Sequence, residues 1–272
     1  MILLVVGGSG FLGREVVRQG VAAGHRVTAT HLTRPPGAEV SSEKLDVRDR
    51  AAVEDLVSRV RPDVVINTAY QSKDWASTAD GAIHVALAAT ATGARLVHVS
   101  SDALFSGQHD HYDESARPDP ITPYGAAKAA AETAIMIINP AAVVARTSLI
   151  IGDGDSPTER LVHALVAKEA TGGLFTDDFR CPVHVADLAA ALLELGSGDR
   201  AGIHHLAGPD SISRHDLGIL IARRDGLDPA LLPTATRAGS GIPGPLDVRL
   251  DCTETQRTLR TRLRGAREFL SG

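Results

Sequence analysis

The sequence predicts a doubly wound α/β fold around a parallel sheet, and three observations favour it. Short aliphatic runs alternate with longer stretches of helical periodicity between residues 1 and 146. The first run, 2–6, is apolar throughout, as a strand covered on both faces would be. A glycine-rich turn follows it directly. Because parallel strands are joined by right-handed crossovers, this order of elements favours the doubly wound architecture.

The predicted elements of the first half follow in a regular order. Strands are expected where β-branched and aliphatic residues gather, at 2–6, 26–30, 63–66, 95–100 and 141–146. Helices are expected where apolar residues recur at helical spacing or alanine dominates, from 12, at 51–60, at 76–92 and after Thr122. These elements make up a main domain over residues 1–150.

The second half is less regular. Residues 152–155 read as a loop, and residues 226–247 are rich in proline and glycine without a clear period. We therefore expect a smaller, less regular C-terminal lobe over residues 151–272, lying over the crevice at the strand ends. The segment 200–206 could still return a strand to the main sheet.

The composition excludes several classes of protein. Apolar content of 43% and charged content of 22% are typical of a globular protein. A net charge of -5 and an aromatic content of 3% argue against a nucleic-acid partner. Two cysteines, Cys181 and Cys252, cannot make a disulfide framework. The N-terminal apolar run is too short for a signal peptide and no later run has the length of a membrane span, so we expect a cytoplasmic protein without a membrane partner.

Glycines crowd the turn between the first strand and the first helix. The stretch Gly7-Gly8-Ser9-Gly10-Phe11-Leu12-Gly13 permits a tight turn and a close approach to a pyrophosphate, which the helix N-terminus would attract. Its spacing differs slightly from the Gly-x-Gly-x-x-Gly fingerprint, and an ordinary tight turn is the alternative. We expect a dinucleotide-binding Rossmann domain, with the cofactor at Gly7, Gly10, Phe11, Leu12 and Gly13.

The choice between the two nicotinamide dinucleotides depends on the end of the second strand. An acidic residue there would bind the ribose hydroxyls of NAD, but the stretch from Thr30 to Arg34 has none. Arg34, together with His31, could meet the ribose phosphate of NADP, unless it is an ordinary solvated charge. NADP(H) is therefore the expected cofactor, and NAD(H) is the alternative. Asp46 and Val47 are expected at the adenine pocket, although Asp46 could equally begin a helix.

Three chain segments are expected to meet at one crevice, because ligands of such sheets bind beyond the carboxyl ends of the strands. The glycine turn is the first of them. Thr68, Ala69 and Tyr70 follow the strand 63–66, and Ser100 ends the strand 95–100. We expect these four residues to contact the cofactor.

The stretch Tyr124-Gly-Ala-Ala-Lys128 places a phenol and an ammonium on one face of a predicted helix. A nearby lysine favours the phenolate, so the pair could exchange a proton with a substrate alcohol or carbonyl. Thr122 and Pro123 suit the start of this helix. The rest of it is nearly apolar, which predicts burial against the sheet or against a partner subunit and leaves a homodimer open. A core phenol and a lysine that reaches solvent are the alternative.

Ser101, next to the end of the strand 95–100, supplies a further hydroxyl. It could hydrogen-bond a substrate oxygen and complete a catalytic arrangement of Ser101, Tyr124 and Lys128. Serines at strand ends are also common turn formers, so this assignment depends on the helix that follows.

Together these stretches resemble the extended short-chain dehydrogenase/reductase superfamily, and within it the RmlD family of sugar-nucleotide reductases. The likeness rests on 7–13, 61–67, 100–107 and 123–128, and it continues in 146–148 and 203–206. It therefore covers nearly the whole chain.

The resemblance implies an NAD(P)H-dependent reductase of a nucleotide-linked 4-keto-6-deoxy sugar. Ser101 would bind the substrate oxygen and Tyr124 would protonate it. Lys128 would lower the pKa of the phenol and hold the nicotinamide ribose. The substrate would contact Ser101, Asp102, Phe105 and Arg180. Arg180 could meet an anionic diphosphate, although a surface salt bridge is the alternative.

Three departures from the family pattern leave other functions open. Ala103 stands where an aromatic residue is usual, Leu149 where a tryptophan is usual, and His84 where an asparagine is usual. The first two fall near the expected sugar pocket, so a ketoreductase of another secondary-metabolite carbonyl is an alternative. An epimerase or dehydratase with tightly held NAD and a non-catalytic, cofactor-binding regulatory subunit are the others.

No metal is expected in this protein. The stretch His109-Asp110-His111 offers candidate ligands, but a third ligand at a suitable spacing is missing from the sequence.

Overall fold

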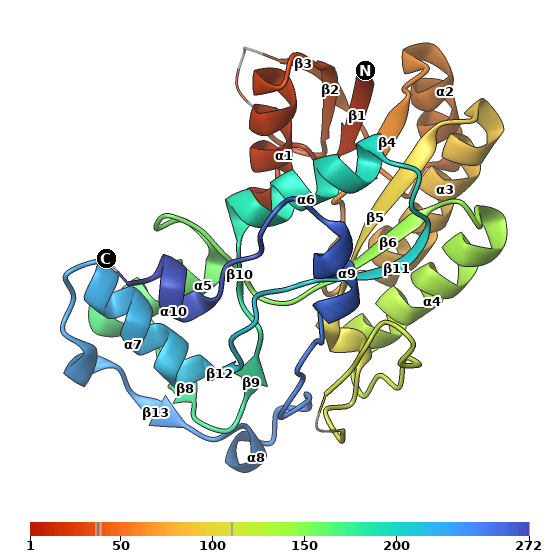
Figure 1. The fold of residues 1–272 in the computed structure, drawn as a ribbon. Helices are drawn as coiled ribbons and strands as arrows, with labels where there is room; N and C mark the ends of the chain where they lie inside the picture. The colour runs from red at the N-terminus through yellow and green to blue at the C-terminus, as the bar shows by residue number, and fades with distance from the viewer. Residues whose placement is uncertain (36, 38–39, 110, 272) are drawn as a thin grey trace.

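Seven parallel strands form the central sheet of the computed structural model, which describes residues 1–35, 37, 40–109 and 111–271 (Figure 1). Their order across the sheet is β11-β6-β5-β4-β1-β2-β3. The bounds are β1 Ile2–Val6, β2 Arg26–His31, β3 Ser41–Lys44, β4 Val64–Asn67, β5 Arg95–Ser101, β6 Val143–Thr147 and β11 Gly202–Leu206. The order reverses between β1 and β4, which makes the sheet doubly wound, as predicted.

Two layers of helices cover the sheet. One layer contains α1 Phe11–Ala22 and α6 Val185–Ser197, and the other contains α2 Arg50–Val60, α3 Gly81–Thr92 and α4 Pro123–Ile138. Leu3 and Val5 pack into the core beneath the first layer, whereas Leu4 and Val6 pack beneath the second. All four side chains are buried. Burial on both faces explains why this strand is apolar throughout.

The predicted strands and helices of the first half are present, with bounds that differ by only a few residues. The predicted helix at 76–92 begins with a π-helical turn, Ala76–Asp80, and continues as α3. The edge strand β3 was not predicted, because its sequence Ser-Ser-Glu-Lys is polar and its side chains are exposed or half-buried.

Two elements beyond residue 150 belong to the layers of the main sheet. The segment 200–206 does return to it, because β11 pairs with β6. Helix α6 also packs on the sheet, beside α1. The division into 1–150 and 151–272 stays a prediction. Strand β11 and helix α6 fall in its second range by number, but they pack with the elements of the first.

The remaining C-terminal elements build a smaller lobe with its own core. They comprise β7 Ile150–Ile151, α5 Pro157–Val166, β8 Leu174–Phe175, β9 Phe179–Arg180, β10 Val183–His184, β12 Ile212–Ser213, α7 Arg214–Arg224, β13 Thr234–Ala235, α8 Arg237–Ser240 and α10 Ala266–Phe269, whereas α9 Thr253–Thr258 packs beside β11. Figure 1 shows most of them gathered to one side of the sheet. Leu217 and Ile221 of α7 form the centre of their apolar cluster.

The lobe contacts the main sheet at the carboxyl end of β5. Arg180 Nε of β9 lies 3.6 Å from Asp102 Oδ2, directly after that strand. None of the helices formed by the described residues combines the length and apolarity needed to cross a membrane.

Candidate active site

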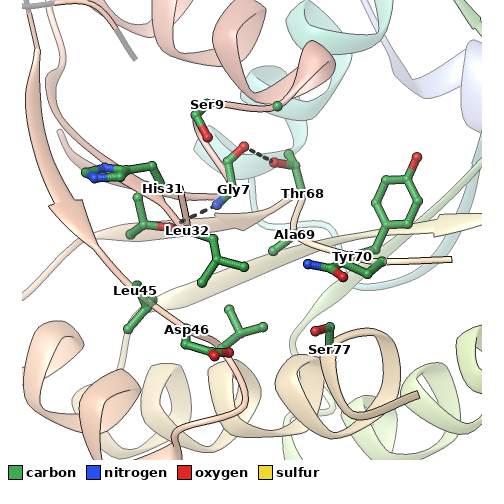
Figure 2. Close-up of a pocket in the computed structure, with 14 residues that line it drawn as sticks. Gly7, Ser9, His31, Leu32, Leu45, Asp46, Thr68, Ala69, Tyr70 and Ser77 are labelled. Carbon is green, nitrogen blue, oxygen red and sulfur yellow. Dashed lines mark hydrogen bonds between the residues drawn. The ribbon is translucent and has the colours of Figure 1, made fainter. Parts of the chain in front are cut away.

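The glycine turn is held in place by hydrogen bonds to neighbouring strands. Gly7 has a φ of +81°, a left-handed conformation that favours glycine. Its N–H donates to Thr30 Oγ1 at 3.0 Å, and its carbonyl accepts from Gly10 N at 2.9 Å and from Thr68 Oγ1 at 3.2 Å (Figure 2). The end of β1 is therefore tied to β2 and to the segment after β4.

Gly13 allows helix α1 to begin directly against this turn. A Cβ at Gly13 would lie 2.2 Å from the Gly7 carbonyl oxygen and 2.8 Å from Gly8 Cα. The N-cap residue of α1 is Gly10, which has no side chain that could cap the first turn. The first N–H groups of α1 are thus left without a side-chain cap, which is the arrangement that binds a phosphate group.

We predict that Gly13→Ala weakens NADPH binding by at least about tenfold, because the added methyl group forces the turn to shift. Fluorescence titration with NADPH measures the change. Gly198→Ala is the control, since its Cβ would meet Glu194 O at 3.6 Å and Leu195 O at 3.9 Å, which are ordinary contacts. A Gly13→Ala protein that binds NADPH like the wild type would contradict the assignment of the turn.

A pocket opens beside the turn, at the carboxyl ends of β1, β2 and β4 (Figure 2). It is lined by Gly7, Ser9, Gly10, Thr30, His31, Leu32, Leu45, Asp46, Val47, Thr68, Ala69, Tyr70, Gln71 and Ser77. Seven of the predicted cofactor residues are among them: Gly7, Gly10, Asp46, Val47, Thr68, Ala69 and Tyr70. The pocket lies at the point where the strand order reverses, which is where ligands of doubly wound sheets bind.

Other predicted cofactor residues lie outside this lining. Leu12 is buried in the core beneath α1, and Gly13 packs against the backbone of the turn. Phe11 packs against Gly152 and is only half-buried. These three residues pack against other parts of the protein, and through this packing they support the turn.

Ser100 and Arg34 also lie outside the pocket lining. Ser100 is 2% exposed, and its hydroxyl has no hydrogen-bond partner among the described residues. A contact between Ser100 and a cofactor is therefore not supported, since the side chain is enclosed. Arg34 is exposed in the loop that follows β2 and is not part of the lining. His31 and Leu32, just before it in the chain, do line the pocket.

Asp46 lies at the pocket and does not begin a helix. Its carboxylate accepts from Arg48 Nη2 at 2.6 Å, and this hydrogen bond holds the pKa of Asp46 below its usual range. The cap of α2 is Asp49, which accepts from Ala52 N at 3.1 Å. The helix alternative for Asp46 is therefore wrong.

Sequence reasoning missed several lining residues, among them Ser9, Thr30, Leu45, Gln71 and Ser77. Leu45 follows the edge strand β3, and the polar sequence of β3 gave no sign of a strand that would lead to it. Ser77 lies in the π-helical turn before α3, which no local pattern distinguishes from an ordinary helix start. The serine of the glycine turn, by contrast, could have been included from its position alone.

The predicted helix of Tyr124 is present with the expected start. The Thr122 side chain accepts from Gly125 N at 3.1 Å, and Pro123 occupies the first position of α4. Lys128, one turn along, is 2% exposed, and its Nζ donates to Val99 O at 2.9 Å. Burial lowers the pKa of Lys128 to about 8, and the charge of Glu132 partly offsets that effect.

Ser101 lies close enough to Tyr124 to act on the pKa of the phenol, so two of the three predicted catalytic residues are neighbours in space. Burial raises the pKa of the Tyr124 phenol well above its ordinary value, and the neighbouring Ser101 hydroxyl only partly offsets this. The expected lowering by Lys128 is not found, because the ammonium is directed at the Val99 carbonyl. The phenol thus keeps its proton at neutral pH, as a proton donor must.

Asp102 and Arg180 belong to a buried polar network next to Ser101. Asp102 Oδ2 accepts from Ser148 Oγ at 2.6 Å. Arg180 is 4% exposed, lies 2.7 Å from Asp178 Oδ1 and donates to Pro245 O at 2.8 Å. The surface salt bridge considered for Arg180 is therefore wrong, since the ion pair is internal. Its contact with a substrate diphosphate stays a prediction.

Phe105 is a core residue, contrary to the expected substrate contact. It is fully buried, and its ring stacks on Tyr112 with centroids 4.1 Å apart and planes 22° from parallel. Arg146 Cζ lies 5.1 Å from the ring centroid. A side chain enclosed in this way offers no surface to a ligand.

The described residues contain no group of three His, Cys, Asp or Glu side chains placed to hold a metal ion. Asp110, the centre of the stretch His109-Asp110-His111, lies outside the described residues.

Comparison with known proteins agrees with this geometry. The profile of the RmlD substrate binding domain family matches residues 1–271. A dTDP-4-dehydrorhamnose reductase of Streptomyces griseus is 32% identical over 253 residues, which cover 86% of this chain and 80% of that protein. A probable low-salt glycan biosynthesis reductase of Haloferax volcanii is 29% identical and covers 89% of this chain and 86% of that protein.

A solved structure shows the same fold over almost the whole chain. The dTDP-4-dehydrorhamnose reductase of Bacillus anthracis, crystallised in complex with NADP, superposes with a TM-score of 0.84 at 21% identity, covering 98% of this chain and 96% of that one. The chain therefore belongs to the RmlD substrate binding domain family.

Proposed function

We propose that this protein reduces the keto group of a nucleotide-linked 4-keto-6-deoxy sugar, with Tyr124 as the proton donor. The observation that carries the proposal is that Ser101 at the end of β5 lies beside Tyr124, with Lys128 one turn along α4, at the edge of the sheet that also carries the pocket. A phenol that keeps its proton and lies beside a second hydroxyl suits the protonation of a carbonyl oxygen. The named activity of the Streptomyces griseus relative supports the substrate class.

The residues present fit a nicotinamide dinucleotide. The uncapped start of α1 and the glycine turn would hold the pyrophosphate, and Asp46 and Val47 would border the adenosine. When bound, the nicotinamide supplies the hydride that reduces the substrate carbon. Thr68, Ala69 and Tyr70 line the pocket on its β4 side, where they would contact the cofactor.

Ser101, Tyr124 and Lys128 would divide the remaining work. The Ser101 hydroxyl donates a hydrogen bond to the substrate oxygen and so favours the negative charge that develops there. The Tyr124 phenol gives its proton to that oxygen and is left as a phenolate. The Lys128 ammonium, which donates to Val99 O, would hold the nicotinamide ribose. The product alcohol leaves, and a proton from solvent restores the phenol.

The preference for NADP(H) over NAD(H) is a separate part of the proposal. His31 lines the pocket, and its Nδ1 has no hydrogen-bond partner among the described residues. Arg34 lies three residues along the same loop and is exposed. In this arrangement, the side chains of His31 and Arg34 would both be available to a phosphate on the adenosine ribose.

We predict that Arg34→Ala weakens NADPH binding by about five- to twentyfold and leaves NADH binding nearly unchanged. Titration of both cofactors against the wild type and the variant measures the difference. Arg26→Ala is the control for a general loss of positive charge, because Arg26 is exposed at the start of β2, the strand that leads to Arg34. An equal effect of Arg34→Ala on both cofactors would remove the phosphate contact from the proposal.

The reaction itself is tested by following NADPH oxidation with a panel of nucleotide-linked keto sugars and non-sugar ketones. Stoichiometric turnover of a 4-keto-6-deoxy sugar is the expected result. Turnover of non-sugar ketones alone would show that the substrate class is wrong. Ultraviolet absorbance of the purified protein adds a second criterion, because a stoichiometric, tightly held nicotinamide would indicate an epimerase or dehydratase that regenerates its cofactor.

A further inference from the structure

Tyr70 joins the cofactor pocket to the catalytic pair. It follows β4 and lines the pocket, while 54% of its surface stays exposed. Its ring centroid lies 5.2 Å from Lys128 Nζ and 5.9 Å from the ring centroid of Tyr124, with the two rings tilted by 46°. A side chain from the β4 loop therefore touches both functional groups that α4 presents.

The contact with Lys128 is of the kind that stabilises a charge. A lysine ammonium within about 6 Å of an aromatic centroid is attracted by the electrons of the ring face, and the attraction grows when water is excluded. Lys128 is 2% exposed, so little water competes for its ammonium. Its one hydrogen-bond acceptor among the described residues is the neutral Val99 carbonyl.

The titratable groups around Lys128 do not replace this contact. His98 of β5 is fully buried, and burial together with the nearby Lys128 holds its pKa well below the usual range, so it stays neutral. Glu132, one turn along α4, raises the pKa of Lys128 through its charge, but its carboxylate is paired with Arg146 at 2.9 Å and accepts no hydrogen bond from Lys128. Tyr124 keeps its proton and is neutral as well.

We propose that Tyr70 is a positioning residue of this site, whose ring holds the Lys128 ammonium and the Tyr124 phenol in the arrangement that proton transfer needs. The proposal rests on the roles given above to Tyr124 and Lys128. It assigns the function to the ring face and not to the Tyr70 hydroxyl, because both contacts are made by the ring. Tyr70→Phe should therefore keep the function of Tyr70, because it keeps the ring. Tyr70→Leu should lose that function, although leucine is also apolar.

Lysine-selective NMR can observe this contact without any substrate. The chain has four lysines, Lys44, Lys73, Lys128 and Lys168, so a protein labelled at the lysine Cε gives a simple spectrum. The signal lost in Lys128→Met identifies Lys128. Wild type and Tyr70→Phe should titrate at about the same pH, near the pKa of about 8 expected for Lys128. Tyr70→Leu should titrate about half to one pH unit lower, because the ring no longer favours the charged form.

Catalysis provides the second readout. Tyr70→Leu should lower kcat by about tenfold or more with a smaller change in KM, and the high-pH limb of its kcat profile should move down with the Lys128 titration. Tyr70→Phe should restore both. An unchanged Lys128 titration in Tyr70→Leu would overturn the proposal, as would a leucine variant with native kcat. If even the wild type reduces no keto sugar, the proposed function fails, while the NMR titration still decides whether the ring holds Lys128.

Discussion

Replacing Tyr124 with phenylalanine is expected to lower kcat for ketone reduction by about 10²- to 10⁴-fold while NADPH binding stays close to that of the wild type. The substitution removes the proton donor, but the ring remains, and Tyr124 is not among the residues that line the pocket. Steady-state NADPH oxidation and a fluorescence titration with NADPH measure the two quantities in parallel.

Tyr112→Phe provides the matched control for the loss of a phenol hydroxyl. Tyr112 is buried, and its hydroxyl accepts from Gly107 N at 2.9 Å, within the loop between β5 and α4 and outside the catalytic helix. We expect this variant to lose some stability and to keep its kcat. If Tyr124→Phe reduced the substrate at the native rate, the assignment of the proton donor would be wrong.

Glu132→Ala is expected to destabilise the protein by about 3–5 kcal/mol, because it leaves a buried guanidinium without its counter-charge. The Arg146 side chain is 1% exposed and that of Glu132 is 4% exposed. Arg146 donates from Nε and Nη2 to the carboxylate, and its Nη1 donates to Ala116 O at 3.1 Å. Arg146 therefore ties β6 and α4 to the loop before α4. Urea denaturation gives the free energy of unfolding.

An exposed ion pair shows how much of that loss depends on burial. Arg50 and Glu54 are paired at 2.6 Å on the surface of α2, with 60% and 44% of their side chains exposed. Glu54→Ala should cost about 0.3–0.5 kcal/mol, because solvent screens the charges. Similar losses for the two variants would contradict the importance of the buried pair.

Local patterns were enough to place the elements that carry the site. The apolar run of β1, the glycine turn after it and the start of α4 at Thr122 and Pro123 all depend on residues within one or two turns of chain. They led to the correct fold and to seven of the residues that line the pocket. Where local patterning was weak, as in the polar edge strand β3, the element and the lining residue Leu45 were missed.

Non-local packing decided the side chains whose roles the sequence left open or assigned wrongly. Phe105 and Arg180 belong to motifs that suggested substrate contacts, yet Phe105 is enclosed by Tyr112 and Arg146, and Arg180 is held by an internal ion pair with Asp178. Part of this enclosure comes from distant segments, since Arg146 covers Phe105 and the Pro245 carbonyl accepts from Arg180, and periodicity does not record such contacts.

The sequence by itself determined the doubly wound sheet, the dinucleotide turn and the pairing of Tyr124 with Lys128 on one helix, because each is encoded in a short stretch of chain. Only the tertiary structure decided that Ser101 reaches Tyr124, that Lys128 is directed at Val99, and that the Tyr70 ring lies against both residues of α4. These contacts join β4, β5 and α4, and they exist because parallel strands bring their carboxyl ends to one edge of the sheet.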